Sequence, residues 1–138
     1  MKPYELIDHT ADIGIRAFGK SLEELFAHAA IGMFEIMADL ENVTPTQTLR
    51  ILLKSPDVEN LYLLWHQELL YHSAVKSVLY KEFVFDALTE THLEAEARGE
   101  EIRFEKHRLK KEIKAATYHG LKVAKSDEGW MGELIFDI

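Results

Sequence analysis

The sequence predicts a single α+β domain in which two long helices pack on a mostly antiparallel sheet. Apolar residues recur at helical spacing over residues 21–38 and again from about residue 55 to residue 79. Around these two segments lie five to seven stretches of strand character. Because the helices and strands do not alternate strictly, an α+β arrangement is favoured. The length of 138 residues fits one domain covering residues 1–138.

The N-terminal segment is expected to form two short strands around a turn, over residues 4–7 and 13–18. A helix then begins where Ser21 and Glu24 provide an S-x-x-E capping box, which satisfies free N–H groups at a helix start. This helix is predicted over residues 21–38. Its apolar stripe consists of Leu22, Leu25, Phe26, Ala29, Met33 and Met37.

Residues 47–54 are expected to form a strand, and a second helix follows it. Ser55 is placed as the N-cap, Pro56 at the first helical position and Asp57 in the first turn. This helix is predicted to run to about Leu79. Its buried stripe consists of Leu61, Leu64, Trp65, Leu69, Val75 and Leu79.

The remainder of the chain has mainly strand character. Residues 81–89 and 91–100 alternate in polarity, as expected for a hairpin. Further strand material covers residues 113–125, and a turn at 126–129 leads to a final strand at 130–136.

Composition restricts the possible functions. The chain contains no cysteine, so any metal must be held by oxygen or imidazole ligands. A net charge of −8 argues against broad nucleic-acid binding, although an acidic protein can still act on an enzyme of nucleic acids by touching the enzyme. No apolar run approaches the roughly 20 residues that span a bilayer, and no signal pattern is present. A cytoplasmic protein without membrane association is therefore expected.

The densest polar cluster, Asp8, His9, Thr10 and Asp12, has two interpretations. Aspartate and threonine side chains commonly stabilise tight turns by bonding nearby backbone N–H groups. Alternatively, Asp12 supplies a carboxylate oxygen to a hard cation such as Ca²⁺, Mg²⁺ or Mn²⁺. One carboxylate does not make a metal site, so the second interpretation needs partners.

The C-terminal residues offer those partners. Asp137 and the α-carboxylate of Ile138 follow the apolar strand segment Leu134-Ile135-Phe136. If this last strand pairs near the first, Asp12, Asp137 and the terminal carboxylate meet. Such a cluster repels itself without a cation, which favours a metal site over a structural role. The alternative is a frayed, solvated chain end.

Several segments together resemble the archease family. They are the opening Asp8–Gly14 (DHTADIG), the helix start Ser21–Phe26, the central Glu112–His119 (EIKAATYH) and the closing Gly129-Trp130 with Ile135–Ile138. The likeness extends over nearly the whole chain. It implies a non-catalytic protein cofactor that activates the tRNA-splicing ligase of the RtcB class, promoting ligase guanylylation and multiple turnover in tRNA exon joining.

The resemblance also implies roles for particular residues. It assigns Asp12, Asp137 and Ile138 to a metal site, with calcium the usual ion, and Lys114 to activation. Lys114 is otherwise typical of a solvated strand residue. The basic run 107–111 before it could face an acidic or phosphate-bearing surface of the ligase, and tRNA would be contacted only indirectly.

Asp8, His9 and His119 remain candidates for supporting the metal ligands through hydrogen bonds. Glu68 and His72, four residues apart on the second helix, are expected to form a polar contact at the edge of the core. Two other functions stay open. One is a metal-dependent phosphoester hydrolase that uses His9 and Asp8. The other is a chaperone-like interaction module in which the acidic cluster is only a turn.

Overall fold

The computed structural model describes residues 2–8 and 11–138 and confirms the α+β class within one domain. Neither helix in these ranges is long and apolar enough to cross a membrane. The elements in chain order are β1 (Tyr4–Asp8), β2 (Asp12–Gly19), α1 (Leu22–Met37), β3 (Gln47–Lys54), α2 (Val58–Lys76), β4 (Val78–Leu88), β5 (His92–Glu101), β6 (Ala115–Ser126) and β7 (Gly129–Asp137).

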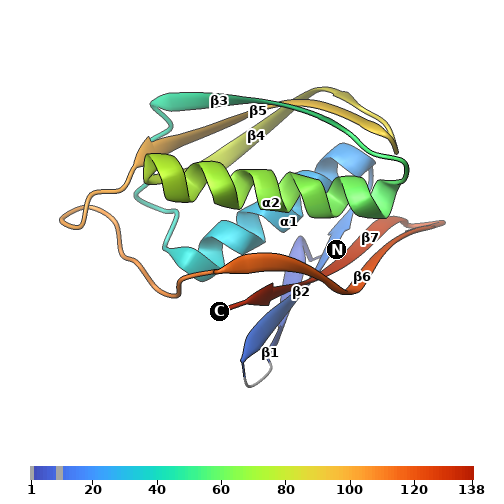
Figure 1. Cartoon of the computed structure of the whole chain (residues 1–138), viewed down its shortest axis with the longest axis horizontal. Coiled ribbons are helices and arrows are strands. Elements are labelled where there is room, and N and C mark those ends of the chain that lie inside the picture. Colours follow the sequence, from blue (N-terminus) through green and yellow to red (C-terminus); the bar gives the residue numbers. More distant parts are fainter. Residues whose placement is uncertain (1, 9–10) are drawn as a thin grey trace.

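The strands form two sheets, and the two helices lie between them (Figure 1). One sheet has the order β1-β2-β7-β6 and the other β3-β5-β4, with every neighbouring pair antiparallel. The sequence indicated the antiparallel strands but not their division into two sheets. Since the helices contact a sheet on either side, each buries more than one face.

The start and end of α2 differ from the prediction. Asp57, not Ser55, is the N-cap, because its side chain accepts a hydrogen bond of 2.8 Å from the backbone N–H of Asn60. The helix ends at Lys76 because Ser77 has the left-handed conformation, with φ 55°. Leu79 therefore belongs to β4. The predicted cap at Ser21 is confirmed, since its Oγ accepts from the N–H of Glu24 at 3.1 Å.

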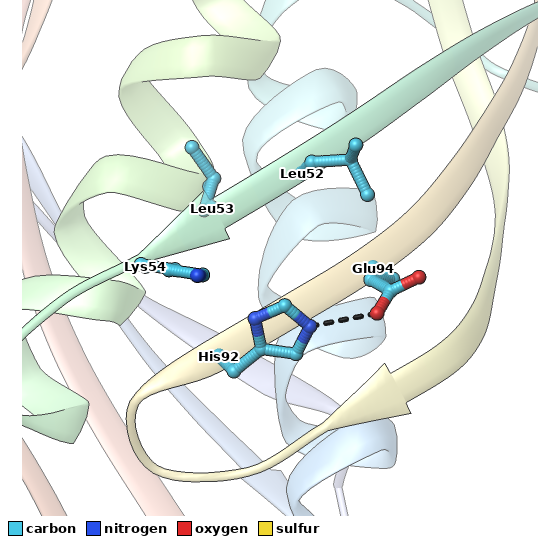
Figure 2. Close-up of a pocket in the computed structure, with 5 residues that line it drawn as sticks. All are labelled: Leu52, Leu53, Lys54, His92 and Glu94. Carbon is cyan, nitrogen blue, oxygen red and sulfur yellow. Dashed lines mark hydrogen bonds and ion pairs between the residues drawn. The ribbon is translucent and has the colours of Figure 1, made fainter.

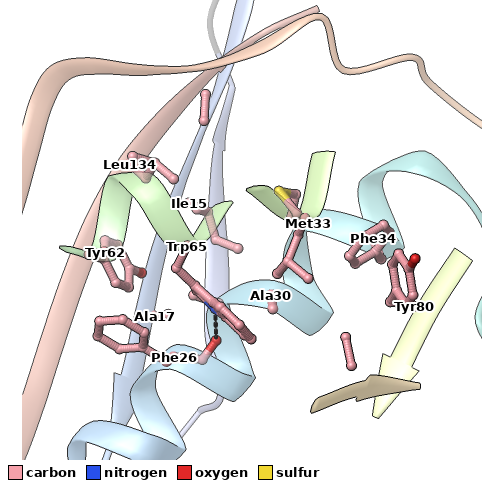
Figure 3. Packing of buried hydrophobic residues seen from close by; sticks show 14 of the residues in the cluster. Ile15, Ala17, Phe26, Ala30, Met33, Phe34, Tyr62, Trp65, Tyr80 and Leu134 are labelled. Carbon is pink, nitrogen blue, oxygen red and sulfur yellow. Dashed lines mark hydrogen bonds between the residues drawn. The ribbon is translucent and has the colours of Figure 1, made fainter. Parts of the chain in front are cut away.

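The two helices meet through an aromatic cluster (Figure 3). The indole Nε1–H of Trp65 donates to the carbonyl oxygen of Phe26 at 3.1 Å, so the buried polar atom of the ring is satisfied. Tyr62 meets Phe26 edge to face, with ring centroids 5.2 Å apart. Val75, which was predicted to belong to the buried stripe of the second helix, is instead 64% exposed on the outer side of α2.

The segment 102–114 links the two sheets and caps the C-terminal end of α1. The backbone N–H of Lys110 donates to the carbonyl oxygen of Met37 at 2.8 Å, and that of Lys111 donates to Ile36 at 3.3 Å. The Nζ of Lys110 donates to the Glu35 carbonyl oxygen at 3.2 Å. These groups satisfy helix-end carbonyls that have no partner within α1, and the lysine charge suits the negative end of the helix.

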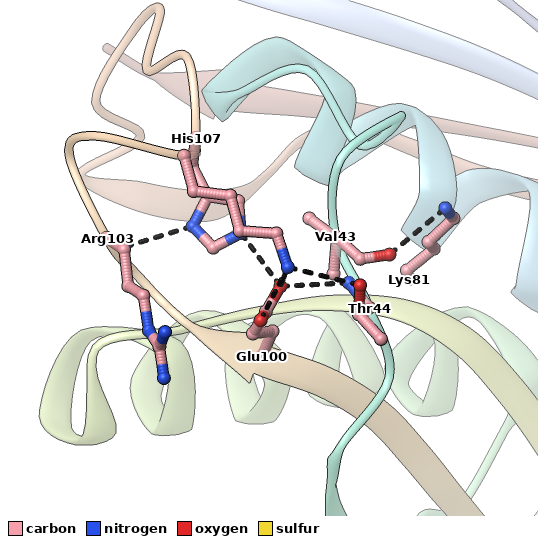
Figure 4. Close-up of polar contacts among 7 residues, drawn as sticks. Val43, Thr44, Lys81, Glu100, Arg103 and His107 are labelled. Carbon is pink, nitrogen blue, oxygen red and sulfur yellow. Dashed lines mark hydrogen bonds and ion pairs between the residues drawn. The ribbon is translucent and has the colours of Figure 1, made fainter.

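A buried polar cluster around Glu100 holds the start of this segment (Figure 4). The Glu100 carboxylate accepts from the Thr44 N–H at 2.9 Å, from Lys106 Nζ at 2.9 and 3.0 Å, and bonds His107 Nε2 at 2.9 Å. The backbone N–H of Arg103 donates to His107 Nδ1 at 3.0 Å. Because Nδ1 accepts this hydrogen bond, the imidazole carries its proton on Nε2 and donates it to Glu100.

These contacts lower the pKa of Glu100 to about 2. The backbone hydrogen bond from Thr44 has the largest effect, and the bonds from Lys106 and His107 add to it, while burial acts in the opposite direction. Each of these donors favours the ionised carboxylate. The cluster therefore stabilises the fold only while Glu100 carries its charge.

We predict that Glu100→Gln lowers the free energy of unfolding at pH 7 and weakens its dependence on acid. The pKa of this carboxyl is depressed on folding, so its contribution is complete above pH 4.5 and is lost as the pH falls toward 2. Urea unfolding at pH 7, 4.5 and 3 measures this effect. Glu90→Gln, in the exposed turn before β5, is the matched control. Equal acid sensitivity of Glu100→Gln and the wild type would contradict the assignment.

Candidate functional site

Asp12 and Asp137 lie directly opposite each other where β2 begins and β7 ends. Side chains of directly opposed residues share one face of a sheet, with Cβ atoms about 4.5–5.5 Å apart. The next pair, Ile13 and Phe136, is buried against the helices. Since neighbouring residues in a strand point to opposite faces, both carboxylates lie on the face turned away from the helices.

The donor set at this position suits a hard cation. Asp12 is half-buried, Asp137 is exposed, and Ile138 packs against the core with its side chain. Two carboxylates that face each other repel unless a positive charge lies near them. Residues 2–8 and 11–138 contain no group of three or more His, Asp or Glu side chains able to hold a metal. A cation here would thus need a further donor, and the α-carboxylate of Ile138 is the one predicted.

Arg16 lies on the same outward face of β2 as Asp12. Its guanidinium bonds Glu5 and Glu133 at 2.8 Å each. Its hydrogen bond is the main cause of the lowered pKa of Glu5. Arg16 therefore completes an ion-pair row across β1, β2 and β7 with these two glutamates.

The backbone of Lys114 lies next to the backbone of Asp137. Its N–H donates to the Asp137 carbonyl oxygen at 2.8 Å, and the following residue, Ala115, is the strand partner of Asp137. The Lys114 side chain is exposed and lines a groove between α2 and β6 that also includes Tyr71. The structure thus brings three predicted residues, Asp12, Asp137 and Lys114, to one end of the sheet.

The three predicted supporting residues are placed differently. The backbone of Asp8 pairs with that of Ile13 in the β1–β2 ladder, and Ile13 directly follows Asp12 in the sequence. His9 lies outside the described residues. His119 is exposed on β6, where the register shifts between Thr117 and Lys122, and its ring stacks on Tyr118 with centroids 5.0 Å apart. Its backbone lies four residues along β6 from Ala115, so the structure does not group it with the carboxylates.

The basic run 107–111 does not form one exposed surface. His107 is buried against Glu100, and Lys110 Nζ lies 3.0 Å from the Asp39 carboxylate. Arg108 and Lys111 remain exposed. The sequence could not indicate this division, because the partners Glu100 and Asp39 are distant from one another in the chain. The expected contact between Glu68 and His72 is confirmed at 3.2 Å.

A second hollow lies on the β3–β5 sheet and was not anticipated (Figure 2). His92 Nε2 bonds Glu94 Oε2 at 2.7 Å there, beside Leu52 and Lys54. The imidazole and carboxylate are both partly exposed, and Arg50 also approaches Glu94 at 3.8 Å. The His92–Glu94 pair is therefore part of a row of surface ion pairs that also includes Arg50.

Comparison with known proteins identifies relatives of the full chain. The model of the Archease protein family matches residues 4–138. Protein archease of Methanosarcina barkeri is 39% identical over 141 residues, covering 99% of this chain and 97% of the relative. Protein archease of Pyrococcus abyssi is 38% identical over 142 residues, with full coverage of both.

Two solved structures have the same fold. The solution structure of protein 1598 of Methanobacterium thermoautotrophicum has a TM-score of 0.85 and 35% identity, with complete coverage of both chains. An archease of Thermotoga maritima, described as a possible chaperone, has a TM-score of 0.68 at 22% identity, covering 96% of this chain and 94% of its own. With the family match over residues 4–138 and relatives near 38% identity, this chain belongs to the archease family.

Proposed function

We propose that this protein is a non-catalytic activator of the tRNA-splicing RNA ligase of the RtcB class. In this role it promotes guanylylation of the ligase and multiple turnover in exon joining, and it acts in the cytoplasm through contact with the ligase. The observation that carries the proposal is the meeting of Asp12, Asp137 and Lys114 at one end of the β2–β7 pair.

The metal part of the proposal assigns a calcium-type site to Asp12, Asp137 and the α-carboxylate of Ile138. Carboxylate oxygens from two paired strands suit Ca²⁺, with Mg²⁺ or Mn²⁺ as alternatives. A bound divalent cation would supply positive charge at the two carboxylates and an attachment point for a phosphate oxygen. Both aspartates are held at fixed register by the sheet, so the donors would need little reorganisation.

Lys114 is proposed to act on the ligase from beside this site. Its main chain is fixed by the bond to Asp137, while its side chain is exposed at the protein surface. An ammonium group on a fixed backbone can offer a charge to a partner without moving the fold.

Calcium should stabilise the wild type but not a variant that lacks the Asp137 carboxylate. Without divalent ions, we predict that Asp137→Asn leaves the free energy of unfolding within about 0.5 kcal/mol of the wild type, because the Asp137 side chain is exposed. With calcium at 100 times its dissociation constant, the wild type should gain about 2.7 kcal/mol, and the variant should gain little. Thermal unfolding with EDTA and with calcium measures both effects.

Glu90→Gln removes an exposed carboxylate from the turn between β4 and β5 and serves as the control. It should respond to calcium as the wild type does. An equal calcium shift in Asp137→Asn and the wild type would place the ion elsewhere.

Activation can be tested directly with the purified ligase of the same organism. The wild-type protein should raise the rate of ligase guanylylation and permit repeated ligation in calcium, magnesium or manganese. Asp12→Ala, Asp137→Ala and Lys114→Ala should each abolish this stimulation while retaining the wild-type circular dichroism spectrum. Hydrolysis of phosphoesters by the wild type alone would instead favour the metal-dependent hydrolase.

The terminal carboxylate has its own test. A short tag added after Ile138 displaces the α-carboxylate but leaves the β2–β7 register intact. We expect the tagged protein to lose calcium binding, measured by isothermal titration, and to lose ligase stimulation. An identical tag before Met1 is the control, and full activity of the C-terminally tagged protein would remove Ile138 from the site.

A further inference from the structure

A groove lies between α2 and the beginning of β6, on the helix side of the sheet whose other face carries the carboxylate pair. Its α2 wall includes Leu70, Tyr71 and Ala74, and its β6 side includes Ile113 and Lys114. Tyr71 is 60% exposed and Val75 is 64% exposed. Residues three and four apart lie on one face of a helix, so Tyr71, Ala74 and Val75 form an apolar strip on α2, of which Tyr71 and Ala74 line the groove.

This exposed strip is not needed to protect the sheet. β6 is an edge strand, and side chains of α2 already bond its free backbone groups. Gln67 Nε2 donates to the Ala116 carbonyl oxygen at 3.4 Å, and the N–H of Val123 donates to Glu59 at 3.0 Å. These contacts cover the edge against strand pairing. Tyr71 and Val75 lie toward the C-terminal end of α2, beyond Gln67, and their exposure is unexplained by the fold.

The lining of the groove restricts what it can bind. Among the described residues that line it, Lys114 carries the sole formal charge, and most of the others are apolar. A ligand matched to this surface is largely apolar and carries one negative group opposite the Lys114 ammonium. An extended peptide segment with a carboxylate side chain has this chemistry.

We propose that this groove docks an apolar segment with one acidic side chain, carried by the protein that this archease activates. The inference rests on the proposed function, since it takes the RtcB-class ligase as that protein. Tyr71 is the anchor, because interface tyrosines bury large area at low entropic cost. Lys114 pairs with the acidic side chain, and its backbone bond to the Asp137 carbonyl oxygen joins the groove to the end of the β2–β7 pair.

RNA is a poorer match for the same groove. Proteins that bind single strands combine several cations along the backbone with stacked aromatic rings. This groove has one cation in a chain of net charge −8. The exposed Tyr118–His119 stack could hold a base, but it lies on β6 outside the groove lining.

The test measures the affinity of the complex with the purified ligase by isothermal titration, in calcium, for the full-length protein. Tyr71→Ala and Lys114→Gln should each weaken binding about tenfold, and Lys114→Arg should retain it within about threefold. Leu52→Ala, an equally exposed apolar residue on β3, is the matched control and should bind as the wild type does. Calcium affinity of Tyr71→Ala should be unchanged.

The outcomes separate this inference from the proposed function. If Tyr71→Ala and Lys114→Gln bind the ligase as tightly as the wild type, docking in the groove is wrong. If they retain ligase binding but lose affinity for a single-stranded RNA oligonucleotide, the occupant is RNA and the inference is overturned. If binding depends on Tyr71 but the wild type does not stimulate guanylylation, the groove stands and the activator role fails. A wild type that does not bind the ligase contradicts both.

Discussion

The antiparallel pairing of β2 with β7 brings the two ends of the chain together, and the core and the candidate site both depend on it. The ladder runs from Asp12–Asp137 to Gly19–Trp130 without a shift in register. Its inner face places Ile15 and Leu134 against the helices, and its outer face carries the Arg16–Glu133 ion pair. A slip of one residue would move the apolar set to solvent and separate the two aspartates, so core packing also fixes the site.

A second constraint comes from the Glu100 cluster in the β3-β5-β4 sheet. Glu100, at the end of β5, binds Lys106 and His107 and so directs the segment 102–114 across the end of α1. The lysine N–H groups that cap α1 lie on this path, and Lys114 follows them to Asp137. The segment 102–114 therefore connects the buried polar cluster around Glu100 with the candidate site through hydrogen-bonded backbone.

The carboxylate end and the α2–β6 groove share Lys114, whose backbone belongs to one and whose side chain lines the other. In the proposed role, Lys114 would connect the charge-bearing site with the apolar docking surface on the helix side of the sheet. The exposed Tyr71 and Val75 would cost little in the free protein and would gain hydrophobic contact when covered.

Local patterns in the sequence determined the α+β class, the capping box at Ser21 and the strand character of both chain ends, because these depend on periodicity and on neighbouring residues. The family likeness singled out Asp12, Asp137 and Lys114 before their positions were known. Only the tertiary structure decided that the strands form two sheets, that Val75 faces solvent and that His107 is buried by Glu100. The sheet division and the exposure of Val75 depend on partners far away in the chain. The contact between Glu100 and His107 depends on the turn at residues 104–106 between them, and no periodicity encodes it. Long-range strand pairing also placed Asp12 opposite Asp137.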